Sequence, residues 1–97
     1  MRVEYHPSVE DELRKIIDFY DERASGLGRE FLNEFERQIL TISSMPESWM
    51  IVERDIRRTL MKRFPFVIYF RALEKNIVRV TVVKHQRRHP RYGLRRR

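Results

Sequence analysis

Residues near the C-terminal end carry the side chains best suited to acid–base chemistry. His85, His89 and Tyr92 supply two imidazoles and a phenol within one short stretch. Cleaving RNA without a metal needs a base for the ribose 2′-hydroxyl, cations for the crowded phosphate and an acid for the leaving oxygen. A guanidinium pairs with phosphate through two parallel hydrogen bonds. The arginines that could do this are Arg57, Arg63, Arg71, Arg79 and Arg88.

His85, Arg88 and Tyr92 are therefore the catalytic candidates if the chain is a nuclease. A histidine that closes a strand pattern also has a structural interpretation, as a hydrogen-bonding residue. His89 precedes a proline and is typical of an extended turn. The sequence leaves the catalytic and structural roles of His85 and Tyr92 open.

Motifs for other chemistries do not occur in the sequence. It has no glycine-rich phosphate loop, no Gly-x-Ser-x-Gly, no His-Glu-x-x-His and no cysteine. We therefore expect no metal and no organic cofactor, and no small-molecule ligand.

Charge is distributed unevenly along the chain. The net charge is +7, yet residues 54–97 carry fifteen bases and two acids, for +13, while residues 7–45 carry −4. Such asymmetry indicates an acidic partner, which could be a nucleic acid, a ribosome, an anionic membrane or an acidic protein. The residues expected to contact a target or partner are Arg57, Arg58, Arg63, Arg71, Arg79, Lys84, Arg87 and Arg91.

The composition favours one small folded domain over residues 1–97. The apolar fraction is 41% and the charged fraction 36%, enough for one modest core. The N-terminus lacks the apolar stretch of a signal peptide, and no apolar run approaches the ~20 residues that span a bilayer. We expect a cytoplasmic protein with no membrane partner.

Hydrophobic spacing predicts a strand followed by two helices. Residues 2–6 alternate as a strand does, and Ser8 is the predicted N-cap of a helix whose apolar spacing runs over residues 9–24. Gly26 can take a positive φ where that helix ends. A second amphipathic helix is predicted over residues 29–45, so the two form an antiparallel hairpin.

After Pro46 the pattern changes to strands. Residues 49–52 could be a short strand or an ordered loop, whereas 56–62, 66–70 and 77–85 are rich in β-branched and aromatic residues. The predicted fold is α+β, with an N-terminal strand and a helical hairpin packed on one face of a mainly antiparallel sheet of three to five strands.

Alternation in the last strand predicts which residues face the helices. Val78, Val80 and Val82 share one face and should meet the helices, which leaves His85 on the open face or its rim. Residues 86–97 follow as a basic C-terminal tail.

Five blocks of the sequence follow one another over nearly the whole chain: Tyr5-His6-Pro7, Gly26-Leu27-Gly28 with Phe31, Arg57-Arg58, Arg63-Phe64-Pro65-Phe66-Val67-Ile68-Tyr69 and His85-Gln86-Arg87-Arg88-His89-Pro90-Arg91-Tyr92. Taken in this order, they resemble the RelE/ParE family of toxins, in particular its ParE-like plasmid-stabilisation branch. Gly93 departs from the pattern, because relatives often carry tryptophan after the tyrosine.

The resemblance implies a bacterial toxin that is neutralised by a cognate antitoxin. Some relatives cleave mRNA on the ribosome, and others poison DNA gyrase. Tyr92 matches a tyrosine of the nuclease branch, but Phe66 and Gln86 fall where that branch carries arginines. We therefore expect a toxin that acts by binding, with gyrase as its target. The alternatives are a ribosome-dependent mRNA endonuclease and, third, a plain nucleic-acid-binding module.

Overall fold

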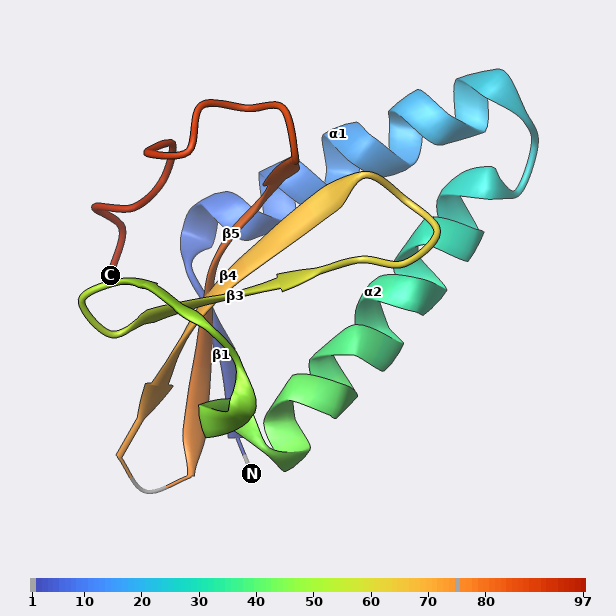
Figure 1. The fold of residues 1–97 in the computed structure, drawn as a ribbon. Coiled ribbons are helices and arrows are strands. Elements are labelled where there is room, and N and C mark those ends of the chain that lie inside the picture. Colours follow the sequence, from blue (N-terminus) through green and yellow to red (C-terminus); the bar gives the residue numbers. More distant parts are fainter. Residues whose placement is uncertain (1, 75) are drawn as a thin grey trace.

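Five strands and two helices form a two-layer α+β fold in the computed structural model, which describes residues 2–74 and 76–97. The strands lie in one sheet of order β1-β5-β4-β3-β2, in which only β1 and β5 pair in parallel. The helical hairpin packs on one face of this sheet, as predicted (Figure 1). The elements in chain order are β1 (Arg2–Tyr5), α1 (Pro7–Arg23), α2 (Leu27–Ser44), the 3-10 turn η1 (Pro46–Ser48), β2 (Ile51–Glu53), β3 (Ile56–Leu60), β4 (Phe66–Leu73) and β5 (Ile77–His85).

The start of α1 differs from the prediction in its capping residue. His6 is the N-cap, and its Nδ1 accepts a hydrogen bond from the backbone N–H of Ser8 at 3.1 Å. Pro7 occupies the first helical position, where its fixed φ suits the helix and its missing N–H costs nothing. The prediction of Ser8 as the N-cap was therefore wrong, because Pro7 starts the helix before it.

Two glycines shape the helical hairpin. Gly26 lies between the helices with φ +85°, as predicted. Gly28 lets α2 approach α1 closely, since a Cβ there would lie 2.6 Å from the carbonyl oxygen of Ile17. Its N–H donates to the Asp21 carboxylate at 2.8 Å, which closes the connection between the helices.

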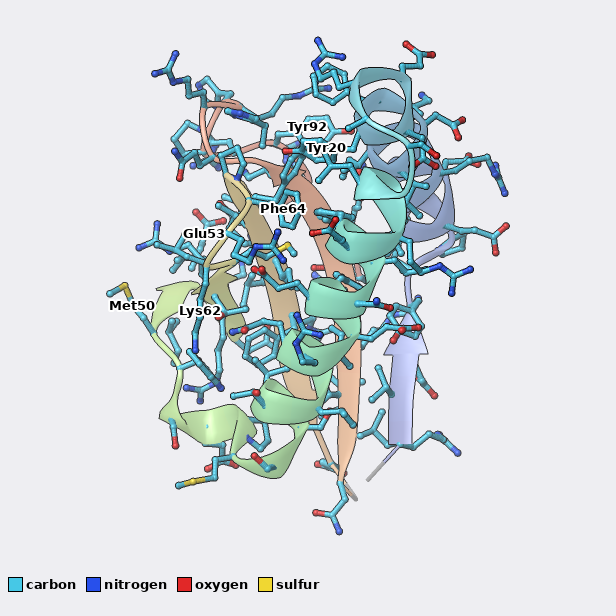
Figure 2. All side chains as sticks on the ribbon, turned by 90° about the vertical axis from the view of Figure 1, so that its right-hand side faces the viewer. Tyr20, Met50, Glu53, Lys62, Phe64 and Tyr92 are labelled. Carbon is cyan, nitrogen blue, oxygen red and sulfur yellow. The ribbon has the colours of Figure 1, made fainter. Side chains whose placement is uncertain are left out.

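The main core lies between the helices and the sheet. Phe31, Phe35, Ile39 and Ile42 of α2 face the sheet and are buried. At one end, Tyr20 of α1 lies between aromatic rings, with its centroid 4.9 Å from that of Phe64 (Figure 2). Side chains of β4 and β5 complete this core, namely Phe66, Ile68, Phe70, Val78, Val80 and Val83.

A bulge in β5 changes which residues face the helices. Phe70 of β4 pairs with Val80, but the preceding Tyr69 pairs with Val82, so Thr81 is an extra residue. Beyond the bulge the alternation is shifted by one residue. Val82 consequently lies in a second core on the outer face of the sheet, and His85 packs against Phe66 on the helix side. The predicted faces of Val82 and His85 were therefore wrong, whereas those of Val78 and Val80 are confirmed.

Residues 86–97 do not extend from the domain as a free tail. They form a series of turns that crosses the outer face of the sheet, opposite the helices (Figure 1). Leu94 is buried in the second core with Ile56, Val67, Tyr69 and Val82.

Gly93 makes this close approach possible. It has φ +79°, and a Cβ at this position would lie 2.3 Å from Cγ2 of Val82. A larger side chain at position 93 would therefore clash with Val82 and be strained by the positive φ.

Candidate functional site

The three catalytic candidates lie together. His85, Arg88 and Tyr92 line one pocket of about 230 Å³ at the end of β5, beside α1. Glu12 and Lys15 of α1 line the same pocket. The bulge in β5 brings this about, because it turns His85 toward α1.

The hydrogen bonds of His85 determine what its ring can offer. Its Nδ1 accepts the backbone N–H of Arg87 at 3.0 Å. A neutral imidazole that accepts at Nδ1 carries its proton on Nε2, so the ring presents a donor to the pocket and not a basic lone pair. His6 and His89 make the same bond, each to the N–H two residues further on. Each of the three histidines thus holds a local turn.

Tyr92 is held between cations and a carboxylate. Its hydroxyl donates to Oε2 of Glu12 at 3.3 Å and accepts from Nη2 of Arg96 at 3.1 Å. The guanidinium carbons of Arg88 and Arg96 lie 4.1 Å and 5.1 Å from its ring centroid. The phenol therefore has both its donor and its acceptor engaged, and cations cover its ring.

Glu12 and Arg96 form the central ion pair of this site. Nη1 of Arg96 lies 2.6 Å from Oε2 of Glu12, and their side chains are 18% and 13% exposed. Glu12 also accepts the N–H of Val83, and Arg96 donates to the carbonyl of Thr81. The pair therefore satisfies backbone groups beside the bulge and ties the C-terminal segment to α1.

Sequence reasoning missed both of these residues. Glu12 stands three residues after Val9 and four before Ile16, both of which are buried. That spacing places a carboxylate on the apolar side of a helix, and this signal could have identified it.

Lys84 departs most from its expected role as a partner contact. It is only 6% exposed. Its ammonium donates to the carbonyls of His89, Pro90 and Tyr92 at 3.0–3.1 Å and lies 4.2 Å from the Tyr69 ring centroid. These bonds use all three ammonium donors, so Lys84 fixes the C-terminal segment over the sheet.

Two further arginine candidates hold other segments of the chain. Arg57 donates to the carbonyls of Glu47 and Trp49 at 3.1 Å and 2.7 Å. Arg63 pairs with the Glu30 carboxylate at 2.8 Å. Neither residue lines the pocket that holds His85.

The remaining arginine candidates lie on the outer face of the sheet or in the C-terminal segment. Arg71 pairs with Asp55 at 2.9 Å, and its hydrogen bond lowers the pKa of that carboxyl below its usual value. Arg79 donates to the carbonyl of Arg97 at 2.7 Å. Three others remain at the surface: Arg58 approaches the sulfur of Met50, Arg91 lies 3.5 Å from Glu53, and Arg87 is exposed.

The described residues contain neither a candidate metal site nor a membrane-spanning helix. Over residues 2–74 and 76–97, no three His, Asp or Glu side chains are grouped so that they could hold a metal ion. Neither helix in that part of the chain has the length and apolar character needed to cross a membrane.

A family model matches almost the whole chain. The model describes the ParE toxin of the type II toxin–antitoxin system parDE, and it matches residues 3–90. The chain belongs to the ParE toxin family. It is accordingly the toxin of a type II toxin–antitoxin system, as the sequence resemblance predicted.

Solved structures agree with the fold of this ParE-family toxin. A chain of the chromosomal ParDE system from P. aeruginosa matches with a TM-score of 0.75 and 13% identity, over 88% of this chain and 95% of that one. The isolated E. coli RelE toxin matches with a TM-score of 0.67 and 15% identity, over 96% and 92%. The search of curated proteins found no match. At these identities the structural matches show the shared fold and leave the target open.

Proposed function

We propose that this ParE-family toxin acts by binding DNA gyrase and does not cleave RNA. The observation that supports the absence of RNA cleavage is the orientation of His85, whose Nδ1 accepts the Arg87 N–H. A general base must offer a lone pair to the ribose hydroxyl, and this ring offers an N–H. Tyr92, the other candidate, has its hydroxyl engaged by Glu12 and Arg96.

The cations around the pocket also support binding over cleavage. The resemblance places arginines of the nuclease branch at Phe66 and Gln86. Phe66 is buried among aromatic rings in this chain, and Gln86 carries no charge. Losing one positioned cation commonly costs on the order of 3 kcal/mol, or about a hundredfold in rate, and two would cost more.

One observation favours the second candidate, a ribosome-dependent mRNA endonuclease. His85, Arg88 and Tyr92 line one pocket, together with Lys15. An endonuclease would need Nδ1 of His85 to release the Arg87 N–H, because a general base requires a free ring nitrogen.

The first prediction separates the two candidates. Purified toxin is expected to inhibit supercoiling by gyrase and to leave mRNA intact on programmed ribosomes. His85→Ala and Tyr92→Phe should each keep gyrase inhibition within about threefold of the wild type, since a binding toxin needs no proton transfer. Truncation before Gln86 should abolish inhibition, because it removes the basic C-terminal segment.

One control variant serves both assays. Lys62→Met, at an exposed position outside the pocket, should behave as the wild type in both. Codon-linked mRNA cuts that vanish in His85→Ala or Tyr92→Phe, with gyrase unaffected, would instead establish the endonuclease.

The second prediction concerns a cognate antitoxin, which we propose binds the basic half through an acidic, partly apolar segment. The +13 charge of residues 54–97 should steer such a segment toward its site. Association rates should fall at least about tenfold between low and physiological salt, because screening shortens the reach of exposed charges. Stopped-flow mixing of the two proteins measures this. Rates that do not change with salt would contradict electrostatic steering.

A further inference from the structure

We propose that residues 86–97 form a fixed cationic surface that contacts the phosphate backbone of duplex DNA. This inference goes beyond the proposed function, since it concerns a nucleic acid and does not depend on which protein the toxin inhibits. It rests on the charge of the segment, on the bonds that fix it and on the kinds of side chain that it exposes.

The segment carries cations and no acids. Residues 86–97 contain six arginines and neither Asp nor Glu. Arg96 is used internally by Glu12, and Arg91 has only a 3.5 Å contact with Glu53. Among the described residues, no ion pair engages Arg87, Arg88 or Arg95, and all three are exposed.

Two part-buried contacts fix the backbone that carries these cations. The ammonium of Lys84 holds the segment through three carbonyls, those of His89, Pro90 and Tyr92. The Glu12–Arg96 pair ties the end of the segment to α1. Cations on a backbone that is already ordered lose less conformational entropy when they bind phosphates.

The exposed side chains fit a polyanion better than a protein. Protein interfaces centre on exposed apolar and aromatic side chains. This segment exposes Pro90 and the His89 imidazole but no large apolar side chain, because Leu94 is buried and the Tyr92 ring is covered by two guanidiniums. Among residues 2–74 and 76–97, the exposed large apolar side chains lie elsewhere, at Tyr5, Phe19, Leu40, Met45, Met50, Ile51 and Leu60.

The lack of an exposed large aromatic ring also favours a duplex over a single strand. Proteins that bind single strands stack bases on exposed aromatic rings, and the only exposed ring of this segment is the His89 imidazole, since guanidiniums cover Tyr92. It has no helix to enter a groove either, since residues 86–97 form turns. The expected contact is therefore with backbone phosphates and is independent of sequence.

The opposite side of the molecule should orient the DNA. The helical hairpin lies on the other face of the sheet, and residues 7–45, which contain it, carry a net charge of −4 (Figure 1). A duplex would be attracted to the C-terminal segment and repelled from α1 and α2.

Fluorescence anisotropy with the full-length toxin and a labelled duplex of about 30 base pairs tests the proposal through its salt dependence. Contacts from Arg87, Arg88, Arg91 and Arg95 predict a slope of about −3.6 in log K against log salt, at about −0.9 per phosphate. Between about 50 and about 200 mM salt the affinity should fall on the order of 150-fold.

A charge-matched pair of variants locates the contact. Arg87→Gln/Arg91→Gln/Arg95→Gln should reduce the steepness of the slope by about 2.7, since three phosphate contacts are lost. Arg14→Gln/Arg29→Gln/Arg37→Gln removes the same charge from exposed helical positions and should keep the wild-type slope. Circular dichroism checks that both variants are folded.

The outcomes separate this proposal from the proposed function. The proposal would be overturned if the salt slope of DNA binding fell equally in the two triple variants. It would also be overturned if Arg87→Gln/Arg91→Gln/Arg95→Gln bound DNA as the wild type does. Binding to a duplex RNA of the same sequence, or to anionic lipid vesicles, without binding to duplex DNA would also overturn it. Gyrase inhibition is measured on the same variants. If it fails in the wild type while DNA binding persists, only the gyrase proposal is lost.

Discussion

Replacing Val80 by aspartate is expected to unfold the protein. Val80 is fully buried on β5, facing the helices, with Phe70 as its partner on β4. A carboxylate there would lie in the main core, among apolar side chains. Burying an unpaired charge costs more than about 4 kcal/mol, a large share of the stability of a small domain. Thermal denaturation followed by circular dichroism should show no cooperative transition for Val80→Asp.

Leu60→Asp is the matched control for this prediction. It makes a comparable change from an apolar residue to aspartate within a strand, but Leu60 is 53% exposed on β3. We expect its stability to stay within about 1 kcal/mol of the wild type. A Val80→Asp variant that melts like the wild type would mean that β5 does not face the helices as the structure has it.

The elements were predictable because their signals are local. Ile77 to His85 was predicted as a strand with the bounds that the structure shows, and Gly26 with its positive φ. The helical hairpin followed from apolar spacing on both sides of that glycine. Ser8 failed as the N-cap because Pro7 begins the helix one residue earlier and leaves His6 as the N-cap, whereas propensity alone ranks serine higher.

The site was less predictable because it depends on a bulge. Strict alternation places Val82 with the helices. The residue types in β5 do not indicate that Thr81 is an extra residue in the pairing with β4. Once the alternation shifts, His85 turns to α1 and Lys84 turns to the outer face. The sequence could identify His85, Arg88 and Tyr92, but not that Glu12 and Lys84 would hold the segment around them.

Replacing Lys84 by methionine is expected to release the C-terminal segment from the sheet. Methionine keeps most of the side-chain volume but removes the donor shared by three carbonyls. Those carbonyls would be left without partners in the closed state and could regain water only when the segment opens. We expect the closed state to lose on the order of 2 kcal/mol, which raises the open population about 30-fold.

Limited trypsin digestion measures this opening directly. Cleavage after Arg91 and Arg95 should accelerate on the order of 30-fold, because cleavage of a rapidly opening segment follows the open population. Lys62→Met changes an exposed lysine two residues after the end of β3 and should leave the rate unchanged. The core between the helices and the sheet does not include Lys84, so the Lys84→Met variant should still unfold cooperatively. Unchanged cleavage in Lys84→Met would mean that the Glu12–Arg96 pair and Leu94 suffice to hold the segment.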